Sequence, residues 1–271
     1  MCESWVIGKK VGMGDAVQST SGADLPPLSQ ANAEPGGRMI FGVVSLLHAI
    51  IEPLVDRDWR EQQKIPARGG VVLVVNHISN VDPLAVGQFV AFSGRWPRFL
   101  AKESLFRIPV VGAVIRACGQ IPVRRGTAAA QDALVEAVRA VDAGRAVVVY
   151  AEGTITLDPD LWPMRGRTGA ARIALSTSAP VVPIGQWGAQ DVMYGKRIHL
   201  PHLRPRTTFR LLVGDPVPLD DLRGQPLTTA VLTEATDRIM AAVTALVAEL
   251  RGEQPPAERF DPRAVTAGVR R

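Results

Sequence analysis

The chain has few cysteines, few aromatic residues and no long apolar run. Its two cysteines, Cys2 and Cys118, lie far apart in the 271 residues, which argues against a disulfide framework and favours a reducing compartment. The longest uncharged apolar stretch, residues 39–51, is shorter than the roughly 20 residues that a membrane-spanning helix needs. We therefore expect no transmembrane helix, and the composition is compatible with a protein bound at a membrane surface.

The net charge of the chain does not identify a single class of binding partner, and the spacing of its cysteines and histidines does not indicate a metal site. The chain carries 31 Lys and Arg against 26 Asp and Glu, a formal net charge of +5. This excess fits an anionic membrane surface or a phosphorylated substrate, and ordinary solubility explains it equally well. Aromatic residues make up only 5% of the chain and no nucleic-acid-binding motif is present, so we expect no nucleic-acid partner. No zinc-type spacing occurs, and we expect no bound metal or cofactor.

The composition divides the chain into four parts. Residues 1–37 are rich in Gly, Ser and Pro and are expected to form a flexible extension. Residues 38–60 suit an amphipathic helix at a membrane interface, and a helix packed on the protein's own core fits them about as well. Residues 61–251 would form the main folded domain. Residues 252–271, rich in Pro and Arg, would be a loose C-terminal tail.

Strands and helices are expected to alternate along the main domain. Two runs, residues 71–75 and 146–150, are almost wholly apolar and rich in valine, which is typical of strands buried on both faces. Further strands are expected at residues 98–101, 119–123, 181–186 and 207–213, the last of them antiparallel. Helices are expected at residues 79–92, 128–143, 168–178 and 227–251, and a short helix or loop at residues 109–118. This pattern predicts an α/β fold with a mixed, mostly parallel central sheet flanked by helices, after an N-terminal amphipathic helical segment.

His77 and Asp82 follow the first of these buried strands. An imidazole group can take a proton near neutral pH, and a carboxylate on its second nitrogen fixes the tautomer and stabilises the imidazolium. We therefore interpret His77 as a general base and Asp82 as its orienting partner. Taken alone, the pattern H-x₄-D is more often that of an aspartate in the first turn of a helix, here one whose N-cap would be Ser79.

Other candidate residues follow neighbouring strands. Ligands of parallel sheets bind beyond the carboxyl ends of the strands. If the strands are parallel, Asn76 and His77 would share that edge with Arg124, Arg125 and residues 151–154. Residues 151–167 form a long loop, and long loops in compact domains are often functional.

Four ordered segments of the chain resemble the sequence blocks of one enzyme family. They are residues 76–83 (NHISNVDP), residues 99–125 (with FLAKESLF and GQIPVRR), residues 150–154 (YAEGT) and residues 179–184 (APVVPI). In this order they are similar to the blocks of the PlsC-like glycerolipid acyltransferases, which act on lysophosphatidate and glycerol phosphate. The resemblance covers roughly two thirds of the chain and implies that residues 61–251 form an acyltransferase domain.

The resemblance implies a metal-independent O-acyltransferase of phospholipid biosynthesis. His77 would deprotonate an acceptor hydroxyl, which attacks the thioester of acyl-CoA or of an acyl-carrier protein, and Asp82 would orient His77. The residues implied to bind the acceptor, with Arg125 and Lys102 at its phosphate, are Lys102, Arg125, Glu152, Gly153 and Thr154. The residues expected in accessory roles are Asn76, Ser79, Arg124, Arg165 and Arg167. Read singly, each of these is compatible with an ordinary turn or surface residue.

The sequence departs from the family pattern beside these residues. Arg124 stands where the family often has aspartate, and Ala151 replaces a proline. Ile155 replaces an arginine that often follows E-G-T, a loss for which Arg165 and Arg167 could compensate. A backbone N–H group at the helix start near Ser79 could bind the thioester oxyanion. The residues that could line a groove for the acyl chain, and that fit an ordinary core equally well, are Leu84, Val86, Phe89, Val110, Val111, Val114 and Ile115.

Three hypotheses follow. The first is acyl transfer to 1-acylglycerol 3-phosphate or glycerol 3-phosphate by a peripheral or monotopic protein on the cytoplasmic face of the cell membrane. The second keeps this chemistry and changes the acceptor to another glycolipid or lysolipid. The third is a non-catalytic protein that binds a membrane surface through its basic patches.

Overall fold

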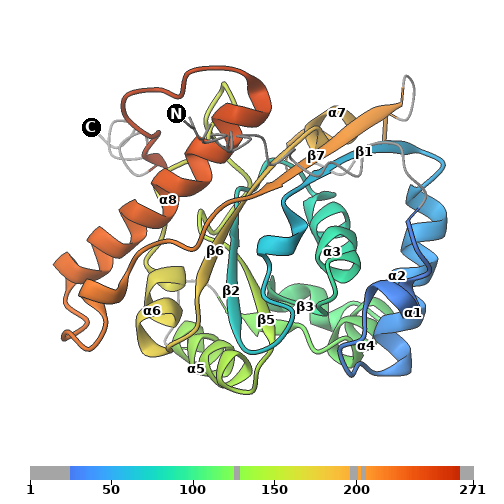
Figure 1. Ribbon diagram of the computed structural model, residues 1–271, viewed down its shortest axis with the longest axis horizontal. Helices are drawn as coiled ribbons and strands as arrows, with labels where there is room; N and C mark the ends of the chain where they lie inside the picture. Colours follow the sequence, from blue (N-terminus) through green and yellow to red (C-terminus); the bar gives the residue numbers. More distant parts are fainter. Residues whose placement is uncertain (1–24, 125–128, 196–200, 203–205, 263–271) are drawn as a thin grey trace, which may run out of the picture.

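A seven-stranded sheet forms the centre of the computed structural model, which describes residues 25–124, 129–195, 201–202 and 206–262 (Figure 1). The strands lie in the order β1-β7-β6-β2-β5-β3-β4. All neighbouring strands run parallel except β6 and β7, which are antiparallel. The strands are β1 (Val55–Arg60), β2 (Val71–Val75), β3 (Pro97–Lys102), β4 (Ile121–Val123), β5 (Ala146–Tyr150), β6 (Val181–Trp187) and β7 (Thr207–Val213). The expected α/β fold with a mixed, mostly parallel sheet is confirmed.

Helices cover both faces of the sheet. Figure 1 shows α1 to α4 on one side and α5, α6 and α8 on the other. The helices of the described residues are α1 (Leu28–Ala31), α2 (Arg38–Ile51), α3 (Asp82–Phe92), α4 (Val111–Ala117), α5 (Ala129–Asp142), α6 (Gly169–Ser176), α7 (Ala189–Val192) and α8 (Thr229–Arg251). Short 3₁₀ helices lie at η1 (Gln62–Lys64), η2 (Glu103–Arg107) and η3 (Asp220–Leu222).

The apolar sequence of β2 follows from its place at the centre of the sheet. Val71, Leu73 and Val75 pack into the apolar cluster that includes α2 and α3. Val72 and Val74 pack into the second cluster, with α5, α6 and α8. All five side chains are at most 1% exposed. Both faces of the strand are covered by helices, so a polar face would place polar groups in the core.

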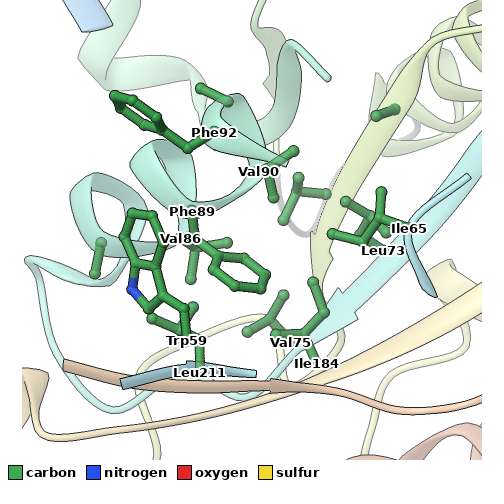
Figure 2. Packing of buried hydrophobic residues seen from close by; sticks show 14 of the residues in the cluster. Trp59, Ile65, Leu73, Val75, Val86, Phe89, Val90, Phe92, Ile184 and Leu211 are labelled. Atoms are coloured by element: carbon green, nitrogen blue, oxygen red, sulfur yellow. The ribbon is translucent and has the colours of Figure 1, made fainter. Parts of the chain in front are cut away.

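The first cluster joins β1 to α3 (Figure 2). Trp59 of β1 is 1% exposed. It meets the ring of Phe89 edge to face, with ring centroids 5.4 Å apart. Such aromatic pairs add about 0.5–1.5 kcal/mol beyond the area that they bury. This packing fixes α3, and with it the start of the helix at Asp82.

The N-terminal part folds differently from the expectation. The helix expected over residues 38–60 ends at Ile51, and residues 55–60 form β1, which pairs with β7 in the main sheet. The expected flexible extension 1–37 is also wrong for residues 25–37, because Leu28 is 6% exposed and the N–H of Trp96 donates to Glu34 at 2.6 Å. Residues 1–24 lie outside the described residues. The folded domain therefore begins before residue 61.

The C-terminal segment is not loose up to residue 262. The N–H of Arg165 donates to the carbonyl oxygen of Phe260 at 2.9 Å, and Arg259 pairs with Asp237 at 3.2 Å. These contacts tie the segment to the 151–167 loop and to α8. Residues 263–271 lie outside the described residues. Among the described helices, none is long and apolar enough to cross a bilayer.

Candidate active site

The end of β2 is clamped to β6 by a buried amide. Asn76 is fully buried, its Nδ2 donates to the Gln186 carbonyl at 3.1 Å, and its Oδ1 accepts the Gln186 N–H at 2.8 Å. The Gln186 side chain returns a third hydrogen bond to the Asn76 carbonyl at 2.9 Å. Asn76 therefore holds the backbone from which His77 projects at the carboxyl edge of the sheet.

His77 and Asp82 form a close pair. His77 Nδ1 lies 2.7 Å from Asp82 Oδ2. The same oxygen accepts the N–H groups of Ile78 at 2.7 Å and Ser79 at 2.9 Å. A carboxylate acceptor requires Nδ1 to carry a hydrogen, which leaves Nε2 of the neutral ring free to accept a proton. Asp82 thus organises the helix start and orients His77 at once, so the two interpretations of H-x₄-D describe one arrangement.

The helix start differs from the expectation in two respects. α3 begins at Asp82 rather than at Ser79. Ser79 Oγ instead donates to the Met193 carbonyl at 2.5 Å, pinning the loop to the segment after α7. The N–H of Ser79 is bound to Asp82, as is that of Ile78, so both are occupied in this state. These two N–H groups are therefore not available to a thioester oxyanion in this geometry, and an oxyanion donor elsewhere at this helix start stays a prediction.

The imidazole ring of His77 is also held from its face. The ring of Tyr150, at the end of β5, stacks on it with centroids 4.2 Å apart and an interplanar angle of 19°. The hydroxyl of Tyr150 is buried without a hydrogen-bond partner among the described residues. Burial, helped by the charge of Asp82, raises the pKa of Tyr150 well above its ordinary value. Tyr150 therefore stays neutral and acts on His77 through ring contact.

Glu152 connects the loop after β5 to His77. Its side chain is 2% exposed. Oε1 accepts the N–H of His77 at 2.9 Å, and Oε2 accepts the N–H of Met164 at 2.9 Å. The N–H of Thr156 donates to the His77 carbonyl at 2.7 Å. Burial raises the pKa of Glu152 to about 8, although the two backbone N–H groups lower it. Both carboxylate oxygens hold backbone in this structure, and an acceptor-binding role for Glu152 stays a prediction.

Gly153 and Thr154 continue this turn beside His77. Gly153 has φ +73°, a conformation that L-residues with a side chain rarely adopt. A Cβ at this position would lie 2.7 Å from Cδ of Arg167, so the arginine side chain crosses directly over the glycine. Thr154 and His77 both line one apolar groove. These positions suit contact with a substrate, which remains their predicted role.

The predicted cationic residues fall into three groups. Arg124 makes two 2.6 Å hydrogen bonds to Glu103, whose pKa its guanidinium holds at about 2. Arg165 pairs with Asp261 at 3.4 Å. Lys102 is exposed at the groove, and neither Lys102 nor Arg167 has a carboxylate within ion-pair distance among the described residues. Arg125 lies outside the described residues.

An apolar groove of about 620 Å³ opens beside His77. Four elements form its walls: the N-terminal part of α3, strand β3, the η2–α4 segment and α2. Of the residues expected to line a groove, Leu84, Val114 and Ile115 do so. Val86 and Phe89 are fully buried in the core, and Val110 and Val111 lie outside the groove as exposed residues.

The α2 wall was missed at the level of the sequence. Ile40, Val43, Val44 and Leu47 line the groove. Their spacing of i, i+3, i+4 and i+7 is that of one helical face, and it could have identified them. The described residues contain no group of three or more His, Cys, Asp or Glu placed to hold a metal.

Comparisons with known proteins extend this picture. Residues 57–187 match the sequence model of the Acyltransferase family. The chain is 32% identical over 123 residues to 1-acyl-sn-glycerol-3-phosphate acyltransferase of Borreliella burgdorferi (45% of this chain, 47% of the relative). It is 32% identical over 148 residues to the chloroplastic 1-acyl-sn-glycerol-3-phosphate acyltransferase BAT2 of Brassica napus (53% and 40%). The chain thus spans about half the length of these curated relatives or less.

Two further similarities concern the acceptor and the fold. The chain is 29% identical over 171 residues to N-acylphosphatidylethanolamine synthase of Arabidopsis thaliana (58% of this chain, 59% of the relative). Its fold is similar to the crystal structure of the 1-acyl-sn-glycerophosphate (LPA) acyltransferase PlsC from Thermotoga maritima, with a TM-score of 0.62, 23% identity and coverage of 80% and 81%. The likeness to this structure covers far more of the chain than residues 57–187.

Proposed function

We propose that this chain is an acyltransferase of the PlsC-like family and that it transfers a fatty acyl group from a thioester to the hydroxyl of 1-acylglycerol 3-phosphate or glycerol 3-phosphate. The observation that carries the proposal is the His77–Asp82 pair, 2.7 Å apart, at the mouth of an apolar groove. The pair supplies a base with a free ring nitrogen, and the groove supplies a place for an acyl chain. The names of two relatives supply the acceptor class.

The reaction proceeds in two steps. Nε2 of His77 takes the proton of the acceptor hydroxyl while the hydroxyl oxygen attacks the thioester carbonyl carbon. The tetrahedral intermediate then collapses, an ester bond is kept, the carbon–sulfur bond breaks, and the leaving thiolate takes the proton from the imidazolium. Asp82 stabilises that imidazolium. The hydroxyl is itself the nucleophile, so no covalent acyl-enzyme forms, and base assistance of this kind contributes roughly 10²- to 10⁴-fold.

The phosphate of the acceptor needs cations near Thr154. Lys102 and Arg167 fit this role because both are exposed and neither is neutralised by a carboxylate of the described residues. The guanidinium of Arg167 starts directly over Gly153, next to Thr154. A guanidinium binds phosphate bidentately, which orients it as well as attracting it. Arg125 keeps its predicted role here.

A place at a membrane surface, on its cytoplasmic face, belongs to the same proposal. α2 presents apolar residues on both sides: Ile40 and Val44 face the core and groove, whereas Leu46 and Ile50 are 62% and 51% exposed. A helix with exposed apolar side chains on its outer side is stabilised at a lipid interface, because those side chains leave water there. The peripheral or monotopic placement brings the groove to the lipid that contains its substrates.

A second candidate is transfer to the amine of phosphatidylethanolamine. The similarity to N-acylphosphatidylethanolamine synthase favours it, since that relative is matched over 59% of its length. An amine nucleophile would use the same base and the same groove. Another glycolipid or lysolipid is a further acceptor for the same chemistry.

An acceptor panel tests both candidates. The purified full-length chain is incubated with oleoyl-CoA, or with oleoyl-acyl-carrier protein, and each acceptor in turn, with free thiol and lipid product both measured. We expect thiol release and phosphatidate with 1-oleoylglycerol 3-phosphate. Product from phosphatidylethanolamine alone would favour the second candidate. Absence of acyl transfer with every donor and acceptor would contradict both.

A further inference from the structure

The segment between β3 and α4 carries an exposed apolar tip. Leu105, Ile108, Val110 and Val111 are 42%, 45%, 77% and 44% exposed. They lie within seven consecutive residues of η2 and the start of α4. Single exposed apolar side chains are common, but a contiguous group of this kind is typical of a surface that meets a partner or a membrane.

The backbone at the tip is strained in a way that exposes Val110. Val110 has φ 64° and ψ −60°, and the N–H of Val111 donates to the Pro109 carbonyl at 2.7 Å. These values define a rare, strained γ-turn with positive φ, and a β-branched residue is among the least suited to it. Strain of this kind persists only where the surroundings impose it, and it is enriched at functional sites.

The surroundings of the tip impose this strained backbone conformation. Gly112 packs so closely that an added Cβ would lie 2.1 Å from the Phe106 carbonyl oxygen. The N–H of Gly112 donates to the Ile108 carbonyl at 2.8 Å, and Arg116 Nη1 donates to the Phe106 carbonyl at 2.6 Å. These contacts hold the backbone of the tip in its strained conformation.

The tip stands beside the opening of the groove. Leu105 of η2 lines the groove, as does Ile115 of α4. α2 lines the same groove, and Figure 1 shows α2 and α4 next to each other. On the outer side of α2, Leu46 and Ile50 are more than half exposed. The groove thus opens between two exposed apolar elements.

The charge around this surface is mostly positive. Residues 38–51 contain no acidic residue, and residues 102–117 contain only Glu103. Glu103 is bound by Arg107 and Arg124. Lys102 and Arg116 add positive charge without a carboxylate partner among the described residues. Basic residues around an apolar tip complement the negative surface of an anionic bilayer.

We propose that residues 105–111 insert into an anionic lipid bilayer together with the outer side of α2, so that the groove opens directly into the lipid. The part of this inference that concerns substrate entry into the groove rests on the proposed function. Binding of the chain to lipid vesicles can be measured without any enzymatic activity. Val110 is the deepest residue of the inserted tip. A second copy of the chain is the competing occupant. An anionic bilayer fits the exposed apolar tip and the basic residues without carboxylate partners better, because its surface is negative and its interior is apolar.

Vesicle partitioning of the full chain tests the proposal. The vesicles contain phosphatidylcholine with about a third phosphatidylglycerol, or phosphatidylcholine alone. We expect the double variant Ile108→Ser/Val110→Ser to lower the partition coefficient about tenfold, given the transfer free energy of the lost apolar groups. The control Val135→Ser changes an equally apolar side chain, 49% exposed on α5 across the sheet, and should leave binding unchanged.

Val110→Gly separates docking from folding. Glycine accepts positive φ without strain, so the variant should melt no lower than the wild type while binding vesicles less tightly. Unchanged vesicle binding in both this variant and the double variant would overturn the proposal. So would a dimer, seen by sedimentation, that the double variant converts to monomer while vesicle binding stays intact.

Activity in the same samples separates this inference from the proposed function. Acyl transfer to a short-chain acceptor dissolved below its micelle concentration should be unchanged in the double variant. Loss of vesicle binding with no acyl transfer in any sample would support the docking surface and contradict the proposed function. Acyl transfer by the wild type, together with vesicle binding that the double variant does not alter, would support the proposed function and contradict the docking surface.

Discussion

Glu152→Gln is the substitution whose consequences the structure specifies most closely. Glu152 is 2% exposed, and each of its oxygens accepts one backbone N–H, from His77 and from Met164. Glutamine keeps one acceptor oxygen and replaces the other by an NH₂ group, which cannot accept. One buried N–H therefore loses its partner, which costs about 1–3 kcal/mol.

The ionisation of Glu152 in the wild type also makes the free energy of unfolding depend on pH. Burial raises the pKa of Glu152 from 4.5 to about 8 in the folded state. The folded protein then binds more protons than the unfolded chain between these values, so the stabilising contribution is full below pH 4.5 and is lost as pH rises through 8. At 1.36 kcal/mol per unit, the loss is at most on the order of 4–5 kcal/mol.

Denaturant unfolding at several pH values measures both effects. Between about pH 5 and pH 8 the free energy of unfolding should fall more in the wild type than in Glu152→Gln, so the gap between the two narrows or reverses. The acyl-transfer rate of the variant should also fall, because the N–H of His77 is one of the two that Glu152 holds. A stability difference that stays constant across this pH range would refute the reasoning.

Three further changes have defined outcomes. Asp82→Asn keeps an acceptor for the helix start but cannot stabilise an imidazolium, so kcat should fall about 10³- to 10⁴-fold in steady-state assays. Gly87→Leu fills the groove, where an added Cβ first meets Phe99 at 3.6 Å, so the ratio of palmitoyl-CoA to hexanoyl-CoA turnover should drop. Arg251→Ala removes a guanidinium stacked between two tryptophan rings, 4.0 and 4.4 Å from their centroids. Calorimetry should show it less stable by about 1–3 kcal/mol.

The central sheet was predictable because the apolar composition of its central strands indicates that they are buried on both faces. The run at 71–75 has no polar residue, and such a run is stable only with helices on both faces. The position of His77 followed from the same reasoning, because parallel strands deliver their following residues to one edge. The hydrogen bond from His77 to Glu152 confirms this convergence for β2 and β5.

β1 was not predictable by the same signal. Its sequence, VDRDWR, contains only two apolar residues, and its middle inward position is occupied by Arg57, which is buried against Glu52 by an ion pair that only the folded chain makes. The role of Ser79 was missed for a similar reason. Its hydroxyl binds Met193, which lies 114 positions away, and no local pattern reports a partner so distant.

The central claim is that His77 is the base for acyl transfer, and the most direct measurement is thiol release from oleoyl-CoA by His77→Ala. His48→Ala is the matched control, because the polar partners of His48 are Gln88 at 2.6 Å and Glu52 at 3.7 Å. We predict that His77→Ala loses roughly 10²- to 10⁴-fold in kcat with an unchanged melting temperature, and that His48→Ala stays within a few-fold of the wild type. Near-wild-type turnover in folded His77→Ala would contradict the account.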